Sequence, residues 1–177
     1  MQQIDGYHAN DQERCERFLI DDNFLIICYS DTDYLGVGMY FWNHEVDAQW
    51  WKSHKHKECI VKAKINLDAM LYLTDDDVVD ELAELYKHIL DSIKNKFEEM
   101  AKQKSVNLDT AVGLKLDMLY EAFPVHMKKF DVLKGRRHYN RKPESVFLKR
   151  TKLSTKGVDI YCVKEAGVLS QREVVDG

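Results

Sequence analysis

The stretch Tyr34-Leu-Gly-Val-Gly-Met-Tyr-Phe-Trp42 places two glycines shortly before a run of three aromatic residues. Glycine lacks a Cβ, so Gly36 and Gly38 let the backbone approach a neighbouring group closely. The aromatic run from Tyr40 to Trp42, taken alone, indicates a buried strand. The two glycines do not form a Rossmann fingerprint, because no third glycine follows and no strand–helix–strand unit surrounds them.

Strand and helix patterns alternate on either side of this stretch. The short apolar run from Phe24 to Tyr29 predicts a buried strand. A helix is expected from Asn43 to Lys52, because Val46, Trp50 and, one turn earlier, Trp42 fall on a common apolar side. Cys59 to Leu67 alternates between apolar and polar residues in its second half, which indicates another strand. The remaining short elements are a helix from Asp11 to Ile20 and strands at Leu71–Leu73, Val146–Leu148 and Val158–Val163.

A helical block interrupts these strands. Three aspartates, Asp75 to Asp77, are expected to open a long helix, since acidic side chains are favourable at a helix N-terminus. A second helix is expected from Leu108 to Glu121, before Pro124. The apolar stripe that supports the first helix recurs every three or four residues: Val78, Leu82, Leu85, Ile89, Ile93 and Phe97. We therefore predict a single α+β domain, residues 1–177, with a helical insertion at about 75–123.

Charge and composition limit the function classes. The net charge of −4 is uneven, because His126 to Lys156 holds eleven Lys or Arg against two acidic residues, a net +9, which leaves −13 for the remainder. Such a basic segment suits a polyanion, although a solvated face has the same composition. The four cysteines form no C-x-x-C pair, no secretory signal opens the sequence, and the longest apolar run is too short for a bilayer. We expect a cytoplasmic protein with no membrane contact.

Three features occur in a recognisable order. Tyr7-His8 ends a short N-terminal strand, the Gly36 to Phe41 motif precedes a helix, and Glu144 opens a late strand. Together they resemble the His-Tyr-Glu signature of the ADP-ribosyltransferase superfamily, in its diphtheria-toxin and poly-ADP-ribose-polymerase class. The middle motif of that class reads Gly-x-Gly-x-Tyr-Phe, which this chain matches in full. Ala9 departs from the class, which usually has Gly after the histidine.

The resemblance implies a split β-sheet core, NAD as the substrate that donates ADP-ribose, and roles for particular residues. His8 would bind the adenosine ribose, and Tyr40 and Trp51 would enclose the nicotinamide ring. Glu144 would hold the nicotinamide ribose and stabilise the oxocarbenium-like transition state. The catalytic residues would be Glu144, Tyr40 and His8. The residues implied to bind NAD are His8, Ala9, Gly38, Tyr40, Ala48 and Trp51.

The resemblance also implies a biological setting. Small free-standing members of this class often act as bacterial or phage-defence toxins, so the resemblance implies an antitoxin or immunity protein as a partner. The basic segment beside Glu144, with Arg136-Arg137-His138-Tyr139, favours RNA or DNA as the acceptor. A protein acceptor and an NAD glycohydrolase on the same fold remain alternatives.

Two further interpretations come from other classes. The chain could be a non-catalytic binding module that docks a partner through its long acidic helix. His54-x-His56, with His44 and Cys59 nearby, has the residue types of a metal site. No second pair completes a tetrahedral set, so we expect no metal. Neither a Gly-x-Ser-x-Gly elbow nor a Walker loop is present in the sequence, which leaves hydrolase and P-loop classes without support.

Overall fold

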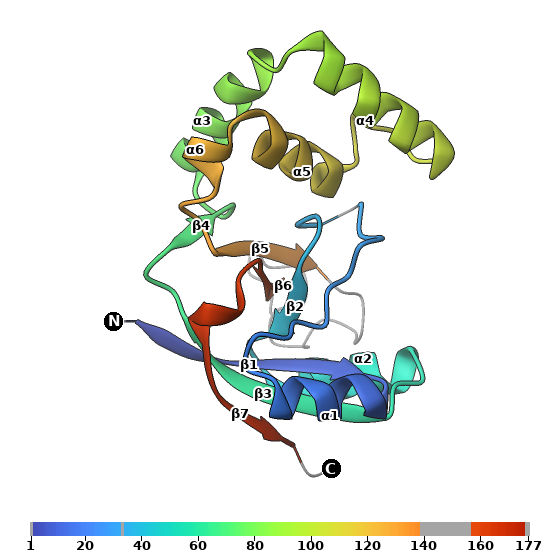
Figure 1. The fold of residues 1–177 in the computed structure, drawn as a ribbon, viewed down its shortest axis with the longest axis vertical. Coiled ribbons are helices and arrows are strands. Elements are labelled where there is room, and N and C mark those ends of the chain that lie inside the picture. Colours follow the sequence, from blue (N-terminus) through green and yellow to red (C-terminus); the bar gives the residue numbers. More distant parts are fainter. Residues whose placement is uncertain (1, 33, 139–156, 176–177) are drawn as a thin grey trace, which may run out of the picture.

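The structure is a computed structural model, and it describes residues 2–32, 34–138 and 157–175 (Figure 1). These residues form a mixed seven-stranded sheet with helices on both faces and at one end, which confirms the α+β class. The elements in chain order are β1 (Gln3–Asn10), α1 (Gln12–Ile20), β2 (Met39–Trp42), α2 (Glu45–His54), β3 (Cys59–Asn66), β4 (Met70–Tyr72), α3 (Asp76–Lys87), α4 (Asp91–Gln103), α5 (Val112–Ala122), α6 (Pro124–Met127), β5 (Val132–His138), β6 (Gly157–Val163), a 3₁₀ turn (Ala166–Val168) and β7 (Leu169–Val174).

The sheet consists of two halves that meet at one residue pair. The strand order is β4-β5-β6-β2-β1-β3-β7, with only β4 and β5 parallel to each other. β1 pairs with β3 over its whole length, and β2 pairs with β6 over all of its residues. Between β1 and β2, however, the register contains only Tyr7 opposite Trp42. The two strands therefore stop pairing beyond this point, and a space opens between their ends.

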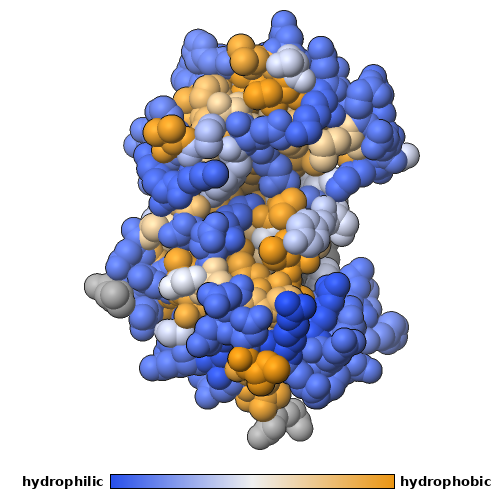
Figure 2. Space-filling view, in the orientation of Figure 1, coloured by the Kyte–Doolittle hydropathy of each residue, from blue (hydrophilic) through white to orange (hydrophobic). Residues whose placement is uncertain are grey.

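Two apolar cores lie on opposite faces of this sheet. On one face, Cys15 and Phe18 of α1 are fully buried against β2 and β3. On the other face, Ala48 of α2 is fully buried in a core that continues into the helices α3 to α6. Figure 2 shows that hydrophilic residues dominate the visible surface, with apolar residues in several separate patches. Within the described residues, no helix is long and apolar enough to cross a membrane.

The helices α3 to α6 form a helical block that links β4 to β5 (Figure 1). Parallel neighbours need a crossover connection of this kind, since a tight turn cannot join them. The single long helix expected from Asp75 is wrong, because α3 ends at Lys87 and Leu90 adopts an extended conformation before α4. Ile89 at this break is buried, with 4% of its surface exposed. The bend lets α3 and α4 both pack against α5, which one straight helix of this length could not do.

Two other local predictions differ from the structure. Phe24 to Tyr29 is not a strand, since it makes only the isolated bridge between Cys28 and Gly38. Its apolar character reflects packing, because Ile26 is buried in the core beside α1. The predicted apolar face of α2 is also wrong, since Val46 is 61% exposed. The predicted strand at 146–148 lies outside the described residues.

Candidate functional site

A pocket of about 550 Å³ opens where β1 and β2 part. Its walls come from the last residues of β1, from β2, from the first turn of α1, from α2 and from the segment 26–31. The volume lies within the range of sites that hold small molecules. The parting of the sheet thus provides a hollow that both halves line.

His8 of β1 is held in one orientation at this pocket. Its Nδ1 lies 2.6 Å from the backbone carbonyl oxygen of Tyr40, and its Nε2 lies 3.0 Å from Nδ2 of Asn10. A carbonyl oxygen only accepts hydrogen bonds, so Nδ1 carries the proton. Burial lowers the pKa of His8 from 6.5 to about 4, although the bond to Tyr40 opposes this shift. The ring is therefore neutral near pH 7, and its Nε2 is an acceptor that faces the pocket residue Asn10.

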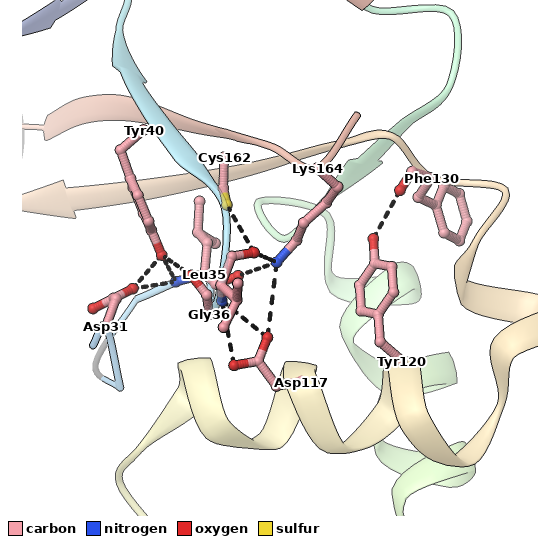
Figure 3. A network of polar contacts seen from close by, with 10 residues as sticks. Asp31, Leu35, Gly36, Tyr40, Asp117, Tyr120, Phe130, Cys162 and Lys164 are labelled. Carbon is pink, nitrogen blue, oxygen red and sulfur yellow. Dashed lines mark hydrogen bonds and ion pairs between the residues drawn. The ribbon is translucent and has the colours of Figure 1, made fainter. Parts of the chain in front are cut away.

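Tyr40 of β2 is fixed by its hydroxyl group. The oxygen accepts the N–H of Leu35 at 3.0 Å, and it lies beside two acceptors, the carbonyl of Gly36 at 2.7 Å and the carboxylate of Asp31 (Figure 3). Burial, with the negative charge of Asp31 as a smaller contribution, raises the pKa of Tyr40 far above its ordinary value. The phenol stays protonated, and its ring is held at the pocket wall by residues 34–37, here called the pocket loop.

Two tryptophans form an aromatic wall. Trp42 of β2 and Trp51 of α2 both line the pocket, with ring centroids 5.7 Å apart and planes tilted by 52°. The ammonium of Lys55 lies 5.3 Å from the ring centre of Trp51, an arrangement that adds a cation–π attraction. A flat aromatic ligand entering this pocket would meet rings whose positions are already set by packing.

Charged groups surround the same hollow. Arg14 of α1 and Lys57 line it, and their positive charges lower the pKa of His8 further, after burial. Lys57 is paired with Asp11 at 2.9 Å, whereas the guanidinium of Arg14 has no ion-pair or hydrogen-bond partner among the described residues. Asp31 is the carboxylate that the described part of the chain contributes to the lining. The pocket is thus suited to a ligand that carries both an aromatic ring and an anionic group.

The residues that the resemblance assigns to NAD are partly gathered in this pocket. His8, Ala9, Tyr40 and Trp51 all line it. Gly38 and Ala48 do not, since they are buried in the protein. A Cβ on Gly38 would lie 2.4 Å from the sulfur of Cys162, so strand packing explains that glycine. Glu144 lies outside the described residues.

Sequence reasoning did not assign most of the other pocket residues, among them Asn10, Arg14 and Asp31. Asn10 follows His8 by two positions on the same strand, so it points to the same side, and this spacing could have identified it. Arg14 lies in the first turn of the helix that directly follows. Asp31 gave no usable signal, because its contact with Tyr40 depends on how the intervening turn folds back.

His54, of the histidine-rich segment from His44 to Cys59, contacts an aromatic ring. The ring of His54 stacks on Trp50, with centroids 4.8 Å apart and an interplanar angle of 11°. Within the ranges 2–32, 34–138 and 157–175, no three His, Cys, Asp or Glu side chains are grouped closely enough to hold a metal ion.

Comparisons with known proteins give no further guide to the site. No protein-family model, no curated protein and no solved structure matches this chain.

Proposed function

We propose that this chain is an NAD-consuming ADP-ribosyltransferase of the His-Tyr-Glu class, with an ADP-ribosyltransferase-like split sheet as its core. One observation carries the proposal. His8, Ala9, Tyr40 and Trp51 come from β1, β2 and α2, and they line a single pocket at the parting of the sheet. The sequence motifs that imply NAD binding are therefore supported by a shared location and not only by their order.

The chemistry of the lining fits the parts of NAD. The neutral Nε2 of His8 is an acceptor for a ribose hydroxyl, in exchange for its present bond to Asn10. The aromatic wall of Trp42 and Trp51 suits the nicotinamide ring. Arg14, which has no partner in the described part of the chain, suits the diphosphate.

Cleavage of the nicotinamide–ribose bond builds positive charge on the ribose, as in glycoside hydrolysis. Catalysis then depends on a rigid ring-binding wall and on a carboxylate near the developing cation. The hydroxyl bonds of Tyr40 supply the rigidity. Glu144 is the carboxylate that the resemblance assigns to this step, and the leaving nicotinamide needs no proton.

A macromolecular acceptor, with nucleic acid favoured over protein, completes the proposal. Of the basic segment, Lys134 and Arg136 are paired with Asp159, at 2.9 and 2.7 Å, so their charges are already compensated. Arg137 lies 4.1 Å from the ring centre of Tyr34, which lines the pocket. This places one cation of the segment beside the pocket, where an acceptor phosphate would approach.

The proposal is tested with NAD labelled in its adenine. The protein is incubated with the label and, in separate reactions, with RNA, single-stranded DNA or cell extract. Label in one polymer establishes the transferase and names the acceptor class. Free ADP-ribose without labelled polymer identifies an NAD glycohydrolase. No consumption of NAD in any reaction contradicts the proposal and favours the binding-module interpretation. Growth arrest on expression, relieved by a Glu144→Ala substitution, tests the proposed toxicity.

A further inference from the structure

The helical block reaches the pocket loop through α5. Gly113, in the first turn of α5, donates its N–H to the carbonyl of Thr32 at 2.9 Å. Gly36 has a φ of +74°, and a Cβ on it would lie 2.8 Å from the carbonyl oxygen of Gly113. A Cβ on Gly113 would in turn lie 2.9 Å from the nitrogen of Gly36. Two facing glycines thus allow helix and loop backbones to approach closely.

Two charged side chains fasten the loop at this contact. Both carboxylate oxygens of Asp117, on α5, accept the N–H of Val37, at 3.0 and 3.2 Å (Figure 3). Lys164, just after β6, donates to the carbonyls of Leu35, at 3.0 Å, and of Val37, and its ammonium lies 3.8 Å from Asp117. The side chains of Asp117 and Lys164 are only 18% and 13% exposed. Their hydrogen bonds are therefore shielded from water. Hydrogen bonds to charged groups are stronger in such a shielded place than in water.

On its other side, the pocket loop contacts the hydroxyl of Tyr40. Leu35 is bonded from both sides: its N–H donates to the Tyr40 hydroxyl and to a carboxylate oxygen of Asp31, at 3.0 and 3.2 Å, and its carbonyl accepts from the ammonium of Lys164. The Gly36 carbonyl is also bonded to that hydroxyl. Residues 35 to 37 of the loop therefore connect the helical block to the pocket wall.

We propose that Asp117 is a positioning residue for the pocket. Together with Lys164, it holds the pocket loop in the conformation that receives the Tyr40 hydroxyl, so the helical block fixes the Tyr40 ring. The helical block therefore supports the site by holding the pocket loop, although it contributes no residue to the pocket lining that the structure describes. The effect on NAD rests on the proposed function, whereas the effect on the loop does not.

The first test needs no ligand and measures amide hydrogen exchange at single residues. In Asp117→Ala, the Val37 amide loses its acceptor directly. The Leu35 amide donates to the pocket residues Tyr40 and Asp31 and not to Asp117, so faster exchange there reports that the loop has moved away from the pocket wall. We expect exchange at Leu35 to accelerate about tenfold or more. Unchanged protection at Leu35 would overturn the proposal.

The matched control is Glu121→Gln, which makes a carboxylate-to-amide change on the same helix. Glu121 pairs with Lys96 of α4 and does not touch the loop, so this variant should leave Leu35 unaltered. Asp117→Asn keeps an oxygen that accepts from Val37 but loses the charge that attracts Lys164. Exchange at Leu35 should accelerate less in this variant than in Asp117→Ala. If the alanine variant does not fold, unchanged exchange at Leu35 in Asp117→Asn would overturn the proposal.

The second test is a double-mutant cycle on the dissociation constant of NAD. Asp117→Ala and Tyr40→Phe should each weaken binding about tenfold, and the double variant should be little worse than either. Fully additive losses would show that Asp117 affects NAD binding independently of the Tyr40 hydroxyl and would overturn the proposal. If the wild-type protein binds no NAD, the proposed function fails, while the exchange at Leu35 still decides whether Asp117 positions the loop.

Discussion

The imidazole Nδ1 of His8 lies 2.6 Å from the carbonyl oxygen of Tyr40, across the place where β1 and β2 cease to pair. A side chain here makes the inter-strand bond that backbone groups make elsewhere in the sheet. The two halves thus stay connected while a pocket opens between them. The connection requires a proton on Nδ1, and burial keeps the ring neutral.

This arrangement predicts an acid-dependent loss of stability. In the unfolded chain His8 binds a proton as the pH falls below its ordinary pKa of 6.5. In the folded chain it binds that proton only near pH 4, because burial lowers its pKa to about 4. The contribution of His8 is therefore complete above pH 6.5 and declines as the pH falls toward 4. The shift corresponds to about 3 kcal/mol in the free energy of unfolding. Urea unfolding at several pH values measures it.

His8→Asn provides the comparison, because its amide can still donate to Tyr40 but does not titrate. The wild-type protein should lose more stability than this variant between pH 6.5 and 4. His88→Asn, which changes an exposed histidine of the helical block, should follow the wild type. Parallel curves for the wild type and His8→Asn would show that His8 is not a buried neutral ring.

A second prediction separates two neighbouring tryptophans. Trp51 lines the pocket, whereas Trp50 stacks on His54 and lies outside the lining. Stacking of aromatic rings contributes about 0.5–1.5 kcal/mol, so Trp51→Ala should weaken NAD binding up to about tenfold. Trp50→Ala should leave the affinity within about twofold. Calorimetric titration with NAD measures both, and equal losses would remove Trp51 from the ring-binding wall.

Local patterns of the sequence predicted most of the elements that the structure describes, but not their contacts. β3 was predictable because the alternation from Cys59 onward has the period of a half-buried strand. The placement of His8 near Tyr40 came only from the resemblance. The prediction of which side of α2 is buried was wrong, because Val46 is apolar yet 61% exposed. The charged Asp47, in contrast, is 6% exposed and has a partner. Composition alone does not reveal which side of a short helix finds a partner.

Contacts between distant residues were beyond such patterns. Asp117 and Val37 are 80 positions apart, and the bond between them depends on the crossover that brings α5 back over the sheet. A carboxylate inside an apolar helix could have been marked as unusual, since charged residues are rarely buried without a partner. Nothing local indicates which backbone amide it would accept.

A third prediction concerns the carboxylate that the resemblance assigns to catalysis. Glu144→Ala should lower the rate of NAD cleavage at least a hundredfold, because loss of charge stabilisation in the transition state has costs of this size. The affinity for NAD and the free energy of unfolding should change little. Glu165→Ala, at an exposed glutamate after β6, is the matched control and should keep full activity. Unchanged turnover in Glu144→Ala would exclude Glu144 from the mechanism.

The last prediction tests the anion-binding wall with two arginines of α1. Arg14 lines the pocket, whereas Arg17 lies 4.0 Å from the ring centre of Phe24 and outside that pocket. A charge-assisted hydrogen bond contributes about 1.5–3 kcal/mol, and exposure of Arg14 to water reduces this toward the lower end. Arg14→Ala should therefore weaken binding of NAD and of ADP-ribose about tenfold, with a smaller loss at high salt.

Nicotinamide, which has no phosphate, should bind Arg14→Ala as it binds the wild type, and Arg17→Ala should bind all three ligands normally. Competition experiments with the three ligands measure this pattern. A loss for nicotinamide equal to the loss for ADP-ribose would mean that Arg14 shapes the pocket as a whole and does not contact the diphosphate. A loss confined to the two phosphate-bearing ligands would place the diphosphate on α1, and thereby orient the nicotinamide end toward Trp51.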